Sequence, residues 1–297
     1  MKSGFISIAG LANAGKSTLI NSLVGEKVAI VSWRPQTTRD RILGILNGDG
    51  YQIAFVDTPG MHKARNQLGE YMMKSVEVSL KDSDGVIYVI DAGRGVSSED
   101  EKFLNEYTTK INVVVALNKE DAVIRETLFA CLEKLGSFPA ICAIVPISAK
   151  KGKNVDALKN EVVKILPEGV ELFPEDMYTD KSMRFMTQEI IREKALYLLD
   201  KEIPYGIGVE VIKFELRDDK PIYDICADIV CEKESHKAII IGKGGSMLKE
   251  IATQARIDIE EMVDSKVFLT LFVKVKTDWR QSEYIMKELG YNKKDLK

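Results

Sequence analysis

The sequence lacks the features that mark secreted, membrane-spanning and metal-binding proteins. Its cysteines show no CxxC or similar spacing that would suggest a metal site; they are Cys131, Cys142, Cys226 and Cys231. We expect four buried, reduced thiols, as in proteins of the cytosol. No apolar stretch approaches the length needed to cross a bilayer. The N-terminal apolar run is short and broken by glycines, so we expect no signal peptide and predict a cytoplasmic protein.

A strong excess of one charge is also missing. The 297 residues contain 42 Lys and Arg against 45 Asp and Glu, which gives a formal net charge of -3. The overall charge therefore does not indicate binding to nucleic acid or to an anionic membrane. Hydrophobic residues make up 45% of the chain, as in a soluble globular protein, and the length favours two domains over one.

The sequence does contain a glycine-rich phosphate-binding loop, GLANAGKST at residues 10–18. It lies between an apolar run and an amphipathic segment, which is the strand–loop–helix order of a P-loop. Gly10 and Gly15 allow the backbone to turn its N–H groups toward a phosphate. Lys16 is expected to reach the β- and γ-phosphates, and the Ser17 hydroxyl is expected to bind Mg²⁺. The predicted nucleotide contacts in this loop are Gly10, Asn13, Ala14, Gly15, Lys16, Ser17 and Thr18.

Two later segments are typical of the loops that sense the γ-phosphate in GTPases. The polar segment SWRPQTTR at 32–39, marked as a loop by Pro35, offers a threonine as a second Mg²⁺ ligand. Thr38 is the favoured ligand and Thr37 is the alternative. The segment DTPG at 57–60 follows an apolar strand, so we expect Asp57 to act on Mg²⁺ through water and the Gly60 N–H to meet the γ-phosphate.

The apolar pattern of the first half predicts a doubly wound α/β domain. Near-continuous apolar runs at 85–90 and 111–117 suit parallel strands that are buried on both faces. Helix candidates follow at 97–107 and 124–135, and a hairpin is expected at 42–56. The ligand of such a fold lies at the carboxyl ends of the strands.

Two further motifs identify the base, NKED at 118–121 and SAK at 148–150. The Asp121 carboxylate can accept hydrogen bonds from N1–H and the 2-amino group of guanine, whereas adenine offers neither donor. Charge-assisted hydrogen bonds contribute roughly 1.5–3 kcal/mol each, so guanine is favoured and a P-loop ATPase is the alternative. Backbone N–H groups near Ala149 are expected to meet guanine O6. The predicted base contacts are Asn118, Lys119, Asp121, Ser148, Ala149 and Lys150.

The five motifs GxxNxGKST, PQTTR, DTPGxH, NKxD and SAK together resemble the Era family of GTPases. Leu11-Ala12 and Ala14 replace the usual Arg-Pro and Val at positions that act through their backbone. Met61 stands where many Ras-like GTPases have a water-orienting glutamine, and the lone His62 that follows is more often structural than catalytic. The resemblance implies that Asn13 helps to hold K⁺ beside the phosphates; the alternative is that Asn13 only satisfies backbone groups of the loop. The catalytic residues expected are Lys16, Asn13, Thr38 and Gly60.

The second half of the chain changes in character. A proline- and acid-rich stretch predicts a linker at 171–181 between a GTPase domain, 1–170, and a second domain, 182–297. The second domain reads as a helix at 181–200, two strands at 208–217 and 222–231, two helices joined by a glycine-rich turn, a strand at 267–275 and a helix at 279–289. This αββααβ order, with GKGG at 242–245 between the two central helices, resembles a type II KH domain.

The glycine-rich turn indicates RNA binding, because the GXXG loop of KH domains clamps the backbone of four nucleotides. Residues 181–297 carry 21 Lys and Arg against 21 Asp and Glu, so a basic groove must be local. We expect stacking and base-edge contacts with a single strand. The candidate RNA-binding residues are Lys237, Gly242, Lys243, Gly244, Gly245, Lys249 and Arg256.

The resemblance covers essentially the whole chain, and it implies a Ras-like P-loop fold with a mixed sheet followed by a smaller α+β KH domain. It implies a Mg²⁺-dependent switch that hydrolyses GTP to GDP, binds single-stranded small-subunit ribosomal RNA near its 3′ end and acts in small ribosomal subunit maturation. It also implies that part of the population lies peripherally on the inner face of the cell membrane. A monomer is expected. The alternative is a signalling GTPase whose second domain binds a protein effector instead of RNA.

Overall fold

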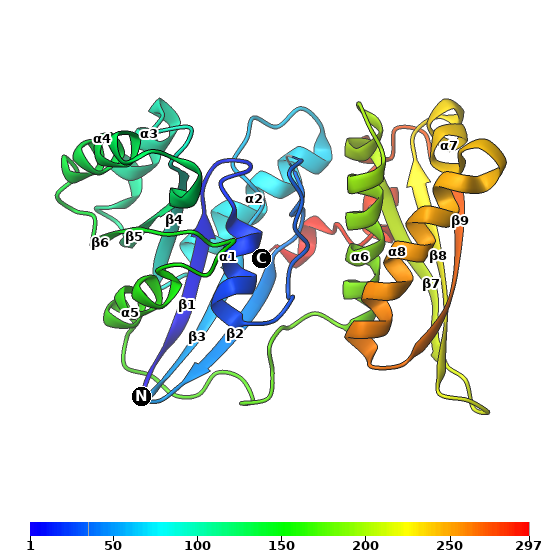
Figure 1. Cartoon of the computed structure of the whole chain (residues 1–297), viewed down its shortest axis with the longest axis horizontal. Helices are drawn as coiled ribbons and strands as arrows, with labels where there is room; N and C mark the ends of the chain where they lie inside the picture. The colour runs from blue at the N-terminus through cyan, green and yellow to red at the C-terminus, as the bar shows by residue number, and fades with distance from the viewer. Residues whose placement is uncertain (35, 297) are drawn as a thin grey trace. The chain divides into compact units, whose positions relative to one another are not determined.

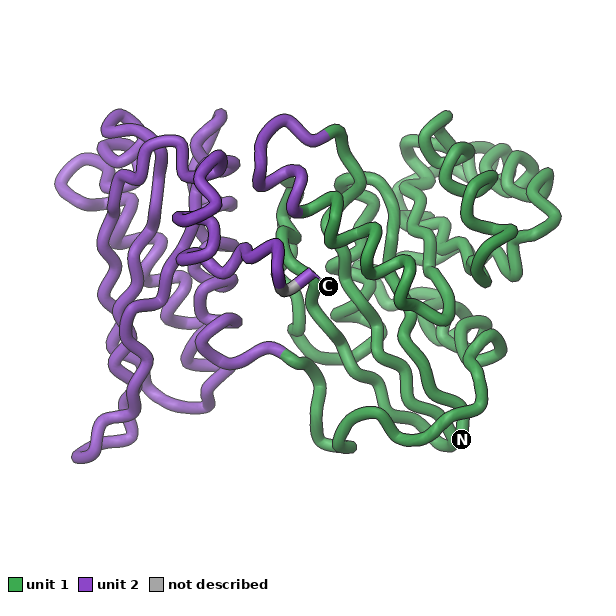
Figure 2. Tube along the Cα trace, turned by 180° about the vertical axis from the view of Figure 1, so that it is seen from behind, with its two compact units in different colours: residues 1–63, 72–180 green, residues 64–71, 181–297 purple. Residues whose placement is uncertain are grey.

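The computed structural model describes residues 1–34 and 36–296, which form two compact units (Figure 1, Figure 2). The first unit contains residues 1–63 and 72–180, and the second contains residues 64–71 and 181–297. Pro35 of the PQTTR motif lies outside the described residues. Each unit has its own sheet and its own hydrophobic core, so each is described by itself.

The first unit is built on a six-stranded sheet with the order β2-β3-β1-β4-β5-β6. Strand β2 is antiparallel to β3 and every other neighbouring pair is parallel, so the expected mixed sheet is confirmed. The hairpin of β2 and β3 closes through the two residues Asp49 and Gly50. The strands are β1 (Lys2–Ala9), β2 (Ile42–Gly48), β3 (Tyr51–Asp57), β4 (Gly85–Asp91), β5 (Asn112–Asn118) and β6 (Ala143–Pro146).

Helices cover both faces of this sheet (Figure 1). Residues of α2 (Gln67–Lys81), α3 (Ser98–Tyr107) and α4 (Arg125–Gly136) share one hydrophobic cluster with alternate residues of β4 and β5. Helices α1 (Lys16–Val24) and α5 (Val155–Ile165) contact each other and the sheet. Strands β4 and β5 are therefore buried on both faces, which explains why their sequences are continuous apolar runs.

The parallel strands bring the motif loops to one edge of the sheet. The P-loop follows β1, DTPG begins at the last residue of β3, NKED begins at the last residue of β5, and SAK follows β6. Because β1, β3, β4, β5 and β6 run in the same direction, their carboxyl ends meet at this edge. The four motifs thus converge although up to 140 residues separate them along the chain.

The segment expected as a linker, 171–181, instead packs on the first unit as far as residue 180. The Gln52 side chain accepts hydrogen bonds from the backbone N–H groups of Leu172 (2.7 Å) and Phe173 (3.0 Å). Further along, the Ile45 N–H donates to the Tyr178 carbonyl at 2.9 Å. This pairing along β2 and β3 places the boundary between the units at residues 180 and 181.

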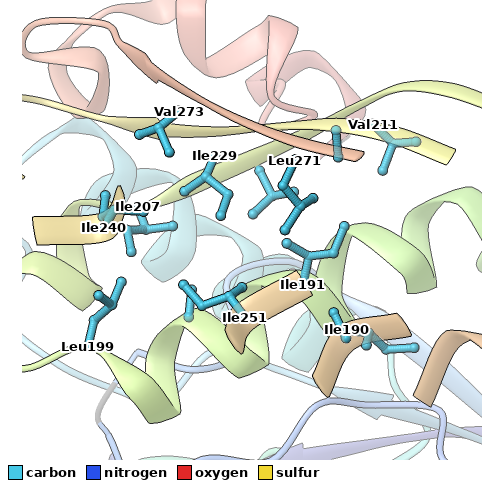
Figure 3. Packing of buried hydrophobic residues seen from close by; sticks show 14 of the residues in the cluster. Ile190, Ile191, Leu199, Ile207, Val211, Ile229, Ile240, Ile251, Leu271 and Val273 are labelled. Carbon is cyan, nitrogen blue, oxygen red and sulfur yellow. The ribbon is translucent and has the colours of Figure 1, made fainter. Parts of the chain in front are cut away.

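The second unit has a three-stranded sheet with the order β7-β8-β9, in which β7 is antiparallel and β9 parallel to β8. Its helices pack on one face of the sheet around the cluster shown in Figure 3, which includes Ile191, Ile229 and Leu271. The αββααβ order expected from the sequence is confirmed. The elements are α6 (Met183–Leu198), β7 (Gly208–Leu216), β8 (Ile222–Cys231), α7 (Glu234–Ile241), α8 (Ser246–Val263) and β9 (Lys266–Val275).

The continuous helix predicted at 279–289 is wrong. The segment forms a 3₁₀ turn, η4 (Trp279–Gln281), and a short helix, α9 (Glu283–Glu288). Ser282 between them is extended, and its hydroxyl caps α9 by accepting from the Ile285 N–H at 3.4 Å. The Trp279 ring is fully buried and donates to the Gly206 carbonyl at 2.8 Å, so burial of this ring determines the path of the chain.

Two other expectations concern the cysteines and membrane spans. All four cysteines are free, but only Cys131 and Cys231 are buried, whereas Cys226 is half-buried and Cys142 is exposed. The expectation of four buried thiols is therefore wrong for Cys142 and for Cys226. Across residues 1–34 and 36–296, every helix is too short or too polar to cross a membrane.

Candidate functional site

The P-loop has the backbone shape that its glycines predict. Gly10, Asn13 and Gly15 have φ values of 147°, 62° and 97°. A Cβ atom on Gly10 would lie 2.4 Å from the Val89 carbonyl oxygen, and one on Gly15 would lie 2.3 Å from Asn118 Nδ2. Glycine is therefore required at both positions by conformation and by space. Helix α1 begins at Lys16, so the unpaired N–H groups of its first turn face the loop.

The first two residues of NKED hold the P-loop in place. The Asn118 side-chain amide donates to the Ala14 carbonyl at 2.9 Å and accepts from the Ala149 N–H at 3.0 Å. The Lys119 ammonium donates to the Asn13 carbonyl at 2.8 Å and pairs with Asp91 at 2.6 Å. The N–H of Ala149 itself is therefore engaged by Asn118, and the contact of backbone N–H groups near Ala149 with guanine O6 stays a prediction.

Asp91 is a further residue of the site that lies outside the motifs recognised in the sequence. It ends β4, directly opposite Asn118 of β5, and its carboxylate orients Lys119. An acidic residue at the carboxyl end of the apolar run 85–90, beside the NKED strand, is the signal that identifies it.

Asp121 is held as an ionised acceptor near the SAK loop. It lies in a 3₁₀ turn, η1 (Glu120–Ala122), and its side chain is 21% exposed. A hydrogen bond from the Ser148 side chain lowers the pKa of Asp121 below its ordinary value, and Lys151 Nζ lies 3.4 Å from the carboxylate. An accessible, ionised carboxylate suits the two N–H donors of guanine. Lys151 was not foreseen from the sequence.

Three oxygen-bearing side chains meet beside the P-loop. Ser17 Oγ lies 2.8 Å from Thr38 Oγ1, and these hydroxyls lie 2.9 and 3.1 Å from Asp57 Oδ2. The Thr37 hydroxyl instead donates to the Arg34 carbonyl at 2.7 Å. Asp57 Oδ1 is buried and has no hydrogen-bond partner among the described residues. Hard oxygen donors around an unpaired carboxylate oxygen fit Mg²⁺.

Burial of opposite charges shifts both pKa values at this site. Burial lowers the pKa of Lys16 to about 8, although the nearby Asp57 opposes the shift. Burial likewise raises the pKa of Asp57 to about 6, and Lys16 opposes that shift. The Lys16 ammonium donates to the carbonyl oxygens of Gly10 (3.2 Å) and Leu11 (3.1 Å). The site is therefore costly to hold in its charged form without further countercharges.

Gly60 lies directly over the P-loop. A Cβ atom at this position would approach Ala12 Cα to 3.0 Å and Lys16 Nζ to 3.2 Å. The next residue, Met61, donates its backbone N–H to the Gly10 carbonyl at 3.2 Å, and its side chain packs against the core cluster of the α2 face. This partly buried thioether has no N–H or O–H group with which to orient a water molecule.

The GKGG turn of the second unit has an unusual backbone. Gly242, Gly244 and Gly245 have φ values of 74°, 61° and 80°, in the left-handed region that favours glycine. A Cβ atom on Gly242 would lie 2.8 Å from the Met247 N, whereas Gly244 and Gly245 have open space around them. Gly242 thus shapes the turn between α7 and α8, and the next two glycines leave its surface clear.

Not all of the predicted basic residues lie near this turn. Lys243 and Lys249 are exposed on the turn and on the first turn of α8, and Lys237 lies in the preceding helix α7. Arg256 lies ten residues into α8, about 15 Å along its axis. Its guanidinium also pairs with Glu260 at 3.1 Å. Arg256 therefore lies away from the rim of the turn, where the sequence pattern had suggested it.

Two different protein families match the two units of the chain. A family model described as "50S ribosome-binding GTPase" matches residues 5–119, and one described as "KH domain" matches residues 202–280. The proteins named GTPase Era of Clostridium novyi and Clostridium kluyveri are 48% and 49% identical to this chain over 98% of its length and 99% of theirs. The chain belongs to the GTPase Era family.

Solved Era structures also match over the whole chain. One is a single-residue variant of Aquifex aeolicus Era bound to GDP·AlF₄⁻, at 38% identity and a TM-score of 0.94 over 98% of this chain and 100% of the other. Another is Era in complex with MgGDPNP and nucleotides 1506–1542 of 16S ribosomal RNA, also at 38% identity and 0.94, over 98% and 99%. The Era architecture, a P-loop GTPase domain followed by a KH domain, is thus confirmed for this chain.

We expect the substitution Asp57→Asn to change how stability depends on pH. The pKa of Asp57 is raised to about 6 by folding, so its stabilising contribution is full below pH 4 and is lost as the pH rises through 6. Relative to the original protein, the variant should gain about 2 kcal/mol between pH 4 and pH 7. Urea denaturation of the chain free of nucleotide and Mg²⁺ measures this difference. The exposed Asp49→Asn is the control, and parallel curves for Asp57→Asn and the original protein would contradict the expectation.

Proposed function

We propose that this chain is a GTP-hydrolysing switch that binds single-stranded small-subunit ribosomal RNA near its 3′ end and acts in small ribosomal subunit maturation. The main support is the whole-chain match to an Era structure that holds both MgGDPNP and nucleotides 1506–1542 of 16S ribosomal RNA. The description "50S ribosome-binding" belongs to a family model that covers residues 5–119 alone, without the KH domain. The match to a KH domain at 202–280 favours RNA over a protein effector as the ligand of the second unit.

We assign the nucleotide to the edge of the first sheet where the four motifs meet. Lys16 and the N–H groups of the P-loop and of Gly60 bind the phosphates, and Asp121, Ser148 and Lys150 surround the base. Thr18, in the first turn of α1, is proposed as a further nucleotide contact. Asn118, Lys119 and Ala149 hold the P-loop and the SAK loop in place through the hydrogen bonds described above. The GTPase domain in this proposal is 1–170 and the KH domain is 182–297, with 171–181 joining them along the first unit.

The Mg²⁺ ligands in this proposal are Ser17 and Thr38, with Asp57 acting through water. Bound Mg²⁺ neutralises phosphate charge. The convergence of both hydroxyls on Asp57 Oδ2 supports Thr38 over Thr37, whose hydroxyl is used by the Arg34 carbonyl. Loss of the γ-phosphate would release Thr38 and with it the loop 32–39.

Asn13 is proposed to help hold K⁺ beside the phosphates. Its backbone is left-handed at φ 62°, and its side-chain amide makes no hydrogen bond to any described residue. The missing hydrogen bond supports the cation role over the alternative, in which the amide satisfies backbone groups of the loop. A free amide oxygen next to the phosphate loop is a suitable ligand for a monovalent cation.

We also propose a cytoplasmic monomer of which a fraction associates peripherally with the inner face of the cell membrane. The support for membrane association is the family resemblance alone. The formal net charge of -3 offers no electrostatic attraction to anionic lipids.

Guanine selectivity can be tested with Asp121→Asn. The change removes the acceptor for N1–H and the 2-amino group, so GTP affinity should fall by roughly 100-fold or more. The new amide can donate to the 2-oxo group of xanthine, so affinity for xanthosine triphosphate should rise. Competition binding of the two nucleotides measures both effects, with the exposed Glu126→Gln as the control. Unchanged preference in Asp121→Asn would contradict the role of Asp121.

Potassium use can be tested by comparing GTP hydrolysis in KCl and NaCl at equal ionic strength. We expect a several-fold higher kcat in KCl for the original protein and no difference between the salts for Asn13→Ala. The affinity for GDP of both proteins serves as the control for loop integrity. Equal rates in the two salts for the original protein would remove K⁺ from the proposal.

RNA binding can be tested at Gly244, where a side chain has room and the backbone is left-handed. Gly244→Asp adds a negative charge where phosphate is expected, so affinity for a short single-stranded RNA from the 3′ end of 16S ribosomal RNA should fall at least tenfold. Gly244→Asn has nearly the same shape without the charge and should bind several-fold more tightly than Gly244→Asp. Gel-shift titration of the full chain measures both; equal affinity of all three proteins would favour the protein-effector alternative.

A further inference from the structure

A histidine beside the P-loop has no role in the site described so far. His62 follows Met61, and its ring Nδ1 lies 2.8 Å from the carbonyl oxygen of Gly60. Because a carbonyl can only accept, Nδ1 carries the proton in this hydrogen bond. The other ring nitrogen, Nε2, is buried and makes no hydrogen bond to any described residue. Within the described part of the chain, the ring is therefore oriented by a single hydrogen bond, the one to Gly60.

That contact fixes a peptide group which also touches the P-loop. The Gly60 carbonyl and the Met61 N–H belong to the same planar peptide. On one side its oxygen accepts from His62, and on the other its N–H donates to the Gly10 carbonyl at 3.2 Å. The Gly10 carbonyl also accepts from the Lys16 ammonium at 3.2 Å. One peptide plane thus links His62 to the lysine that is proposed to bind the phosphates.

A second contact holds the main chain of His62 itself. Its backbone N–H is directed at the sulfur of Met73 in α2, at 3.5 Å. The ring can therefore reach back two residues to Gly60 from a fixed starting point. Gly60 needs such a restraint, because a residue without Cβ has the widest choice of backbone angles. A side chain at position 60 would restrict these angles, but Ala12 and Lys16 leave no room for one.

We propose that His62 is a positioning residue for GTP hydrolysis. Its Nδ1–H holds the Gly60–Met61 peptide against the Gly10 carbonyl and so keeps Gly60 and Lys16 in register over the γ-phosphate. The inference rests on the proposed GTPase function. Met61 contributes its backbone N–H to this arrangement, while its partly buried side chain packs against the hydrophobic cluster of α2, α3 and α4. The hydrogen bond from the His62 ring thus holds the end of the DTPG segment in position.

Three substitutions of His62 test this role in the full chain. His62→Ala removes the donor and should lower kcat about tenfold, which is the loss of one hydrogen bond, with GDP affinity unchanged within twofold. His62→Asn places an amide donor near the position of Nδ1 and should keep kcat within threefold of the original protein. His62→Gln places its amide near the position of Nε2 and should behave like His62→Ala. Single-turnover GTP hydrolysis and GDP titration provide the two measurements.

The outcomes separate this proposal from its alternatives. Equal kcat for all four proteins, or recovery by Gln and not by Asn, would overturn the positioning role of Nδ1. A parallel fall of kcat and GDP affinity in all three variants would indicate a merely structural histidine and would also overturn it. Thermal unfolding of the GDP-bound proteins shows whether each variant is folded. Failure of the original protein to hydrolyse GTP would count against the proposed function and not against His62.

Discussion

A loop that turns several N–H groups toward one point needs support from behind, and the Asn118 side chain supplies it. Its amide bonds to the P-loop at Ala14 and to the SAK loop at Ala149, so a single side chain ties together the phosphate and base sides of the site. This contact also explains a requirement of the P-loop sequence. Asn118 Nδ2 occupies the space that a Cβ on Gly15 would need, so glycine at position 15 follows from packing as well as from its φ of 97°.

The second constraint on the site is electrostatic. Lys16 and Asp57 are both buried. Desolvation lowers the pKa of Lys16 and raises that of Asp57, and the attraction between the two charges offsets only part of each shift. A triphosphate and a divalent cation would supply the missing countercharges. The loops that carry Thr38 and Gly60 approach the same point, and the Gly60–Met61 peptide contacts the P-loop directly. A site whose buried charges are costly without bound countercharges is suited to respond to the presence or absence of one phosphate group.

The second unit also depends on glycines with positive φ, as the P-loop does. Its GKGG turn uses left-handed glycines to pass from α7 to α8 without covering its own surface. The domain as a whole carries equal numbers of basic and acidic residues, and Arg256 is engaged by Glu260. The open surface of the turn, with Lys243 and Lys249 exposed beside it, is what supports the proposed RNA contact.

Although helices α2 and α5 were not foreseen, patterns in the sequence predicted the fold class, the αββααβ order of the second unit and the residues of the nucleotide motifs. This was possible because P-loop, DTPG, NKED and SAK are local patterns whose chemistry depends on residue type and spacing. The folded structure was needed to place the Thr38 hydroxyl, and not that of Thr37, on Asp57, to engage the Ala149 N–H with Asn118 and to bring Asp91 to Lys119. It also divided the segment 279–289 around Ser282, and it placed 171–180 along β2 and β3. These features depend on contacts between residues far apart in the chain or on burial of one ring, neither of which a local pattern contains.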